Sequence, residues 1–160
     1  MDAGRRWRTE RLPDHLGLLA RLILGIVLIV AGGLKVTSPL VSARAVRAFQ
    51  ILPYDFAGYV GYALPVVEIL IGLLLVAGLF TRLSAAVGGL LMVAFIIGIS
   101  SAWARGLSID CGCFGGGGTV AARQTQYLAD LLRDAGLVAC AAWLVARPHA
   151  TYSLDHRLFR

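Results

Sequence analysis

Charged residues are scarce in this chain of 160 residues. Lys, Arg, Asp and Glu make up only 15% of it, whereas hydrophobic residues make up 58%. Soluble domains contain about 25% charged and about 45–50% apolar residues. With a mean hydropathy of +0.77, the chain has more apolar surface than a soluble domain of this length can bury. The composition therefore excludes an ordinary soluble enzyme and a disordered tail, and it indicates one integral membrane domain over 1–160.

Cysteine and histidine are also scarce, with three residues of each type. Three cysteines are too few for a disulfide-rich scaffold. The histidines (His15, His149 and His156) are expected on the opposite side of the membrane from Cys111 and Cys113, so they cannot complete a four-ligand zinc site with these thiols. A Cu(I) ion held by two thiolates stays open as an alternative.

The net charge of +6 has a simple explanation in a membrane protein. Basic residues flank membrane spans and set their orientation, so the charge gives no reason to expect a nucleic-acid partner. If four segments of the chain cross the membrane, both termini lie on the same side of it. Nine of the 15 Lys and Arg residues then lie on that side, and six lie on the opposite side. We therefore expect a multi-pass protein of the cell (plasma or inner) membrane, with both termini cytoplasmic and the loops 36–58 and 104–127 outside.

Four segments are apolar over the roughly 20 residues that a spanning helix needs. They predict spans at about 16–35, 59–80, 83–103 and 128–146. The fold class expected is therefore all-α, an integral membrane four-helix bundle. Between the first two spans, apolar residues at helical spacing after Pro39 predict a short amphipathic helix at about 39–52.

The sequence Cys111-Gly112-Cys113 lies in the second outer loop, next to a run of glycines. A disulfide between cysteines one residue apart closes a small, strained ring, and strained disulfides are easily reduced. Such a short ring adds little stability by chain entropy. The pair therefore favours thiol–disulfide exchange over a structural staple, although a purely structural role and a metal-binding role stay open.

Glu68 is an ionisable residue near the middle of the second span. Such residues are costly in a membrane and are functional candidates by default. Glu68 is expected to be protonated or to pair with Lys35, with Arg133 or with a small bound molecule. A structural polar contact that holds the bundle together is an equally good interpretation.

The fourth span begins with the charged residues Asp130, Arg133 and Asp134. Arg133 is a candidate partner of Asp130 or Glu68, and a cation near the cysteine loop would favour a thiolate. The two aspartates are expected to form a hydrated helix end that complements the helix dipole. Cys140, further along this span, is expected mainly to be a small packing residue.

Several motifs in this order resemble the methylamine-utilisation MauE family, within the broader DoxX-like group of small four-helix membrane proteins. The matching motifs are Arg21-Leu22-x-Leu24-Gly25, Gly32-Gly33 with Lys35, Pro39, Phe49-x-x-Leu52-Pro53, Pro65-x-x-Glu68-x-x-x-Gly72, Gly78-Leu79-Phe80-Thr81-Arg82 and Asp110-Cys111-Gly112-Cys113-Phe114-Gly115. The resemblance covers about residues 16–146, and the last motif is its most specific part.

The resemblance implies a redox-associated accessory protein of the membrane. MauE-like proteins are linked to maturation of a disulfide-rich methylamine dehydrogenase subunit, together with a thioredoxin-like partner. By this resemblance Cys111 and Cys113 would be the thiol pair, with Gly112 between them and Phe114 after them. Glu68 and Lys35 would be polar residues of the bundle, and an extracytoplasmic thioredoxin-like protein would be the partner.

The function expected is thus thiol–disulfide exchange that assists disulfide formation in exported proteins. By analogy with other four-helix disulfide-generating proteins, the bundle is a candidate for holding a quinone near Glu68. Two other functions stay open. One is a non-catalytic membrane scaffold that recruits redox enzymes, and the other is a small transporter that uses Glu68.

Overall fold

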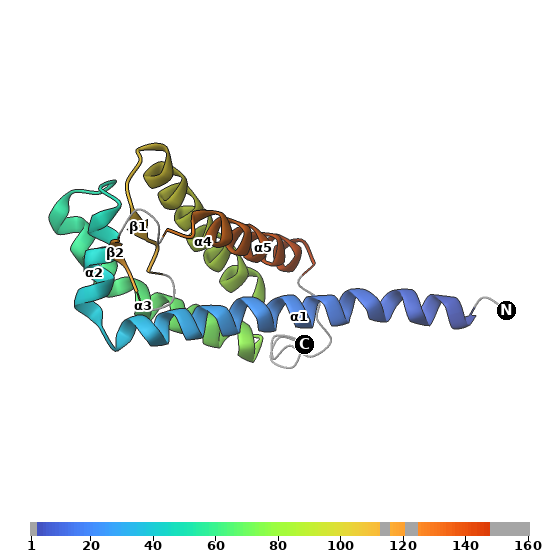
Figure 1. Ribbon diagram of the computed structural model, residues 1–160. Coiled ribbons are helices and arrows are strands. Elements are labelled where there is room, and N and C mark those ends of the chain that lie inside the picture. Colours follow the sequence, from blue (N-terminus) through green and yellow to red (C-terminus); the bar gives the residue numbers. More distant parts are fainter. Residues whose placement is uncertain (1–2, 113–115, 121–124, 148–160) are drawn as a thin grey trace.

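The computed structural model describes residues 3–112, 116–120 and 125–147, with side chains from His15 onward. Its described residues form five helices and two short strands (Figure 1). In chain order these are α1 (Ala3–Val36), α2 (Pro39–Ala48), α3 (Tyr54–Ala77), α4 (Thr81–Ala104), β1 (Ile109–Asp110), β2 (Gly118–Thr119) and α5 (Tyr127–Ala146).

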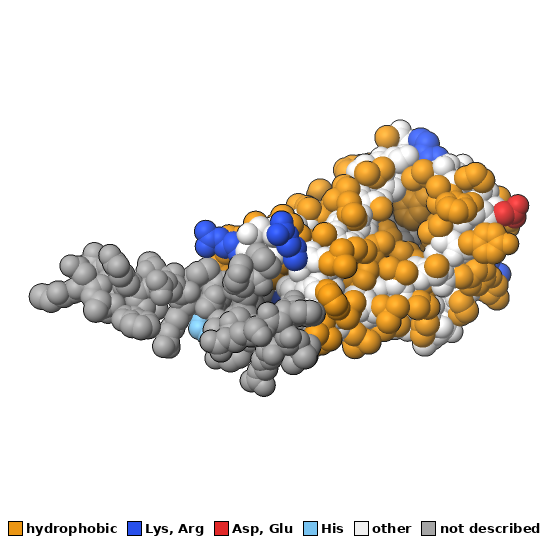
Figure 2. All heavy atoms as spheres, turned by 180° about the vertical axis from the view of Figure 1, so that it is seen from behind, with side chains coloured by type: hydrophobic (Ala, Val, Ile, Leu, Met, Phe, Trp, Pro, Cys, Tyr) orange, Lys and Arg blue, Asp and Glu red, His pale blue; other side chains and the backbone are white. Residues whose placement is uncertain are grey.

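Within the described residues, three helical segments are long and apolar enough to cross a membrane: His15–Val36, Tyr54–Ala77 and Thr81–Ala104. Many of their large apolar side chains point outward, including Ile26, Leu70 and Leu90. Figure 2 shows hydrophobic side chains over most of the described part of one face, with charged side chains toward its two ends. This distribution suits a lipid environment and confirms the expected membrane association.

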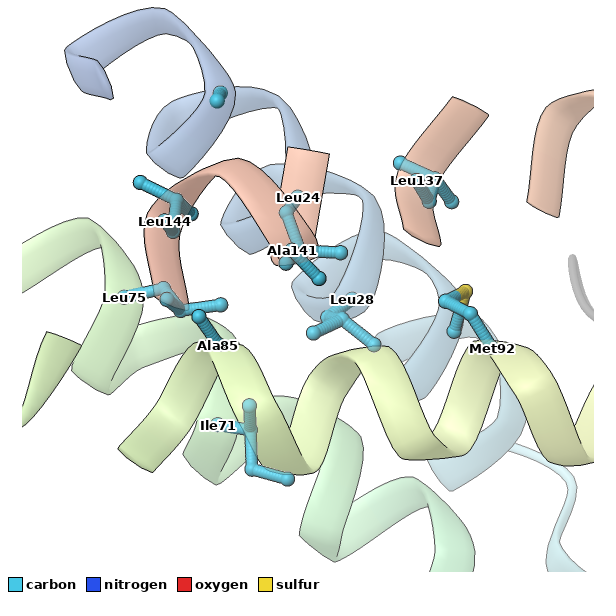
Figure 3. Packing of buried hydrophobic residues seen from close by; sticks show 10 residues of the cluster. Leu24, Leu28, Ile71, Leu75, Ala85, Met92, Leu137, Ala141 and Leu144 are labelled. Atoms are coloured by element: carbon cyan, nitrogen blue, oxygen red, sulfur yellow. The ribbon is translucent and has the colours of Figure 1, made fainter. Parts of the chain in front are cut away.

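The core of the molecule lies among the four longest helices. Its buried residues come from α1 (Leu24 and Leu28), α3, α4 and α5, where Leu137, Ala141 and Leu144 face inward (Figure 3). The all-α class is thereby confirmed.

The predicted fourth span differs from α5 by one residue, but α5 carries three charges in its first two turns. Its crossing of the membrane and the DoxX-like bundle therefore remain predictions.

Two of the predicted segments differ at their ends from the helices of the structure. The second span was expected at 59–80, but α3 begins at Tyr54 and ends at Ala77. Gly78 adopts a left-handed backbone conformation (φ 71°), and the N–H of Leu79 donates to the carbonyl of Leu74. This is a glycine C-terminal cap, which stops the helix. Similarly, α2 ends at Ala48 rather than 52, because Gln50 has a positive φ of 51°.

Glycines bring α1 and α3 into backbone contact. A Cβ atom on Gly72 would lie 2.7 Å from the carbonyl oxygen of Gly25, and one on Gly32 would lie 2.7 Å from the carbonyl oxygen of Pro65. Small residues at a membrane helix interface permit such close approach. Gly32 also lies against Glu68, since its Cβ would be 3.1 Å from the Cβ of Glu68. The contact therefore places Lys35, one turn further along α1, within reach of Glu68.

Pro65 explains how α2 is attached to α3. Proline has no backbone N–H, so the carbonyl of Gly61, four residues earlier, lacks its normal helical donor. The hydroxyl of Ser42 in α2 donates to this carbonyl at 2.7 Å, and the bond is buried. A Cβ on Gly61 would lie 2.5 Å from the Cα of Ala43. The proline thus frees an acceptor, and the glycine allows α2 to approach it.

We predict that Ser42→Ala lowers the free energy of unfolding by about 1–3 kcal/mol, because it leaves a buried carbonyl without a partner. Pro65→Ala restores a backbone N–H for Gly61, so the loss caused by Ser42→Ala should be smaller in that background. Thermal unfolding in detergent micelles, followed by circular dichroism, measures both effects. Ser100→Ala, at an exposed position of α4, is the matched control. Equal losses in the two backgrounds would contradict this role of Ser42.

Candidate functional site

The loop that carries Cys111 is anchored to the start of α5. Ile109 pairs with Thr119 and Asp110 pairs with Gly118 in a two-stranded antiparallel sheet. The hydroxyl of Tyr127 accepts a hydrogen bond from the N–H of Ile109 at 2.8 Å and donates one to the carbonyl of Leu107. Gly118, the last residue of the glycine run that follows the cysteines, therefore belongs to this sheet.

The same loop rests on α2. A Cβ on Gly112 would lie 3.0 Å from the Cβ of Ala45, and one on Gly117 would lie 2.5 Å from it. Gly112 is buried and has a φ of 69°, a conformation that glycine adopts readily. Its N–H donates to the Oδ1 atom of Asp110 at 3.2 Å. Gly112 is therefore required here for packing and backbone geometry.

Cys111 is half-buried and disulfide-bonded. The expected partner Cys113 and the adjacent Phe114 lie outside the described residues, so their roles stay predictions. Cys140 is a free cysteine on α5 that packs against the hydrophobic core. Its position is that of a packing residue.

Arg133 connects the cysteine loop to two carboxylates of α5. Its Nη2 atom lies 3.9 Å from the sulfur of Cys111. Its Nη1 atom lies 2.9 Å from Oδ1 of Asp130, and its Nε atom lies 2.9 Å from Oδ1 of Asp134. The prediction of a hydrated helix end was wrong for Asp134, whose side chain is only 1% exposed. The arginine, by pairing with Asp134, makes this burial possible.

Lys35 and Glu68 form a second charged pair inside the bundle. The Nζ atom of Lys35 lies 2.6 Å from Oε1 of Glu68, and the two side chains are 5% and 0% exposed. The ammonium group of Lys35 also lies 5.2 Å from the ring centroid of Phe95, a cation–π contact. Of the partners expected for Glu68, the structure selects Lys35 rather than Arg133.

A small cavity of about 10 Å³ lies between the Lys35–Glu68 pair and the charged residues of α5. Glu68, Arg133 and Asp134 line it, together with apolar residues such as Leu28 and Met92. A cavity of this size holds about one water molecule. It does not fit a quinone ring, so these residues as arranged do not form the quinone site that was expected near Glu68.

The structure thus brings Cys111 close to Arg133, and Glu68 close to Lys35, with one cavity between the two groups. Sequence reasoning missed the burial of Asp134 and the role of Tyr127 as an anchor. A weak signal existed for Asp134, because it immediately follows Arg133 and lies four residues after Asp130, on the same helical face. No signal in the sequence indicated that Tyr127 would reach back to the cysteine loop.

We predict strong energetic coupling between Lys35 and Glu68. Lys35→Met or Glu68→Met alone should lower the free energy of unfolding by about 3–5 kcal/mol, because each leaves one buried charge uncompensated. The double variant should lose much less than the sum of the two. Chemical unfolding in detergent micelles gives all three values.

Arg82→Met is the matched control for removal of a cation, because Arg82 is exposed in the first turn of α4. It should change stability by less than about 1 kcal/mol. Additive losses at Lys35 and Glu68 would contradict the ion pair.

A model of the protein family described as "Methylamine utilisation protein MauE" matches residues 13–147 of the chain. No curated protein and no solved structure matches the chain significantly. The family match covers all the residues of the candidate site, from Lys35 to Asp134.

Proposed function

The chain belongs to the MauE family of methylamine-utilisation proteins, and from this premise we propose that it exchanges disulfides with an exported partner through Cys111 and Cys113. The observation that carries the proposal is the guanidinium of Arg133, 3.9 Å from the Cys111 sulfur. A cation beside a cysteine stabilises its thiolate, the form that attacks or leaves in disulfide exchange.

The proposed reaction begins with a disulfide between Cys111 and Cys113. A thiolate of a partner dithiol attacks the Cys113 sulfur, a partner–Cys113 bond forms, and the bond to Cys111 breaks with its electron pair left on Cys111. The partner's second thiolate then attacks the partner sulfur of the mixed disulfide and releases Cys113. The partner loses two electrons and two protons, and the cysteine pair is reduced. The reverse sequence oxidises the pair, and the relative redox potentials set the direction.

Arg133 is well placed to act on Cys111 as the leaving group. Its two carboxylate contacts, both at 2.9 Å, fix the guanidinium in the space between α5 and the loop. A fixed cation needs little reorganisation when negative charge appears on the sulfur. The leaving thiolate would therefore be Cys111, and Cys113 would form the mixed disulfide.

The proposed topology puts this chemistry on the outer side of the membrane. Both termini would be cytoplasmic, as the distribution of basic residues indicates, and α5 would be a fourth span. Disulfides form and persist in that compartment. The partner would be a thioredoxin-like exported protein, in keeping with the family resemblance, and its clients would include proteins of methylamine utilisation.

Two observations weigh against a transporter that uses Glu68. The carboxylate is paired with Lys35 at 2.6 Å, and the adjacent cavity has a volume of only about 10 Å³. A scaffold without redox chemistry is the alternative, in which Arg133 would serve only to pair with Asp130 and Asp134.

We predict that Arg133→Gln slows alkylation of reduced Cys111 by iodoacetamide at pH 7 roughly tenfold, since loss of the cation lowers the thiolate fraction. Arg133→Lys should restore part of the rate. Arg44→Gln, an exposed arginine of α2, should leave the rate unchanged. Mass spectrometry of the alkylated peptide gives the rates. The role of Arg133 is wrong if the Gln variant reacts as fast as the wild type.

Thiol trapping in intact cells tests the exchange reaction and the topology together. In a Cys140→Ser background, a membrane-impermeant maleimide should label Cys111 and Cys113 only after mild reduction, because an oxidised outer pair has no free thiols until then. A mobility shift on gels reads the labelling.

Labelling before reduction would mean that Cys111 and Cys113 are free thiols in the cell and form no disulfide. Labelling only by a membrane-permeant reagent would place the loop on the inner side or in a buried position. Either result contradicts the proposed outer redox pair.

A further inference from the structure

Two carboxylate oxygens deep in the bundle lack a hydrogen-bond donor among the described residues. They are Oε2 of Glu68 and Oδ2 of Asp134. The first side chain is 0% exposed and the second 1%. A buried acceptor without a donor is costly, and native structures contain few of them.

Both residues line the same cavity of about 10 Å³. Glu68 reaches it from α3 and Asp134 reaches it from α5. A cavity of this volume holds about one water molecule, and a water has two protons to donate. A proton taken up by either carboxyl group would turn a buried acceptor into a donor.

The charged groups around this cavity come from several elements. Lys35 of α1 is paired with Glu68, and it also interacts electrostatically with Arg133 and Asp134. Asp130 completes the α5 cluster. The α4 residues at the cavity, Met92 and Phe95, are uncharged.

The balance of these charges favours proton uptake on reduction of the disulfide. Asp110 of β1 interacts electrostatically with Asp130 and brings one more carboxylate near the cluster. When ionised, the carboxylates therefore already outnumber the cations Lys35 and Arg133. A thiolate on Cys111 would add a further negative charge beside Arg133, and a nearby negative charge favours the neutral form of a carboxyl group.

We propose that the carboxylates of Glu68 and Asp134 form a proton-accepting site, which takes up one proton when Cys111 is released as a thiolate. This inference rests on the proposed disulfide exchange. Of the two protons that the partner dithiol loses, one goes to Cys113 and the other goes to this site. Oxidation of the pair releases both again, so atoms and charge balance in each direction.

Arg133 transmits the effect electrostatically and keeps its own proton, since guanidinium groups stay charged in proteins. It lies between the sulfur of Cys111, at 3.9 Å, and Oδ1 of Asp134, at 2.9 Å. A thiolate at Cys111 adds a negative charge next to this guanidinium, so the net positive potential at Asp134 becomes smaller. The two sites therefore titrate as a coupled system.

Redox-difference infrared spectroscopy tests the inference on the full chain in lipid nanodiscs, with dithiothreitol as the reductant and Cys140→Ser as the background. Reduction should produce the carbonyl band of a protonated carboxylic acid, shifted in D₂O. The band should be lost in the double variant Glu68→Gln/Asp134→Asn. It should be kept in Asp55→Asn, the matched control, which removes an exposed carboxylate at the start of α3.

The wild-type spectrum is decisive even if the double variant does not fold. Counting free thiols with maleimide in the same sample distinguishes a failure of the proton-accepting site from a failure of the disulfide exchange. If thiols appear on reduction but the carboxyl band does not, the proton site is wrong and the disulfide exchange stands. If no thiols appear, the proposed exchange fails and this inference fails with it. A band that persists in a folded double variant belongs to another carboxyl group and also overturns the proposal.

Discussion

The ion pair between Lys35 and Glu68 is the contact around which the bundle is organised. Two charges in an apolar interior are tolerated only when they compensate each other closely. Their 2.6 Å contact lies where α1 and α3 approach almost to backbone contact, and the glycines at positions 25, 32 and 72 make that approach possible. The small residues and the charged residues of these helices therefore serve one arrangement.

Pro65, one turn before Glu68, extends that arrangement to the cysteine loop. The proline leaves the carbonyl of Gly61 without a helical donor, and Ser42 supplies one. This bond holds α2 against α3, and Ala45 of α2 then forms the surface on which the loop rests. Pro65, within the apolar helix α3, thus contributes to the position of the cysteine loop through two packing contacts.

The sequence predicted the parts of this structure that depend on composition and failed where relative rotation of helices matters. Three of the four predicted spans are apolar helices of sufficient length, as expected. Hydropathy does not say which face of α5 turns inward, so Asp134 was expected in water although it is buried. For the same reason, sequence reasoning left Lys35 and Arg133 as alternative partners of Glu68. Helix ends shifted by several residues, because caps such as Gly78 depend on local backbone geometry rather than on hydropathy.

The polar residues between the bundle interior and the loop bear on the proposed chemistry as well as on stability. A network with a purely structural role gains most when every buried polar atom has a partner. Here Glu68 and Asp134 each keep one oxygen without a donor among the described residues, in the same cavity. An apolar pair in their place would avoid that cost. The cost is understandable if the carboxylates exchange a proton while Arg133, between them and Cys111, responds to charge on the sulfur.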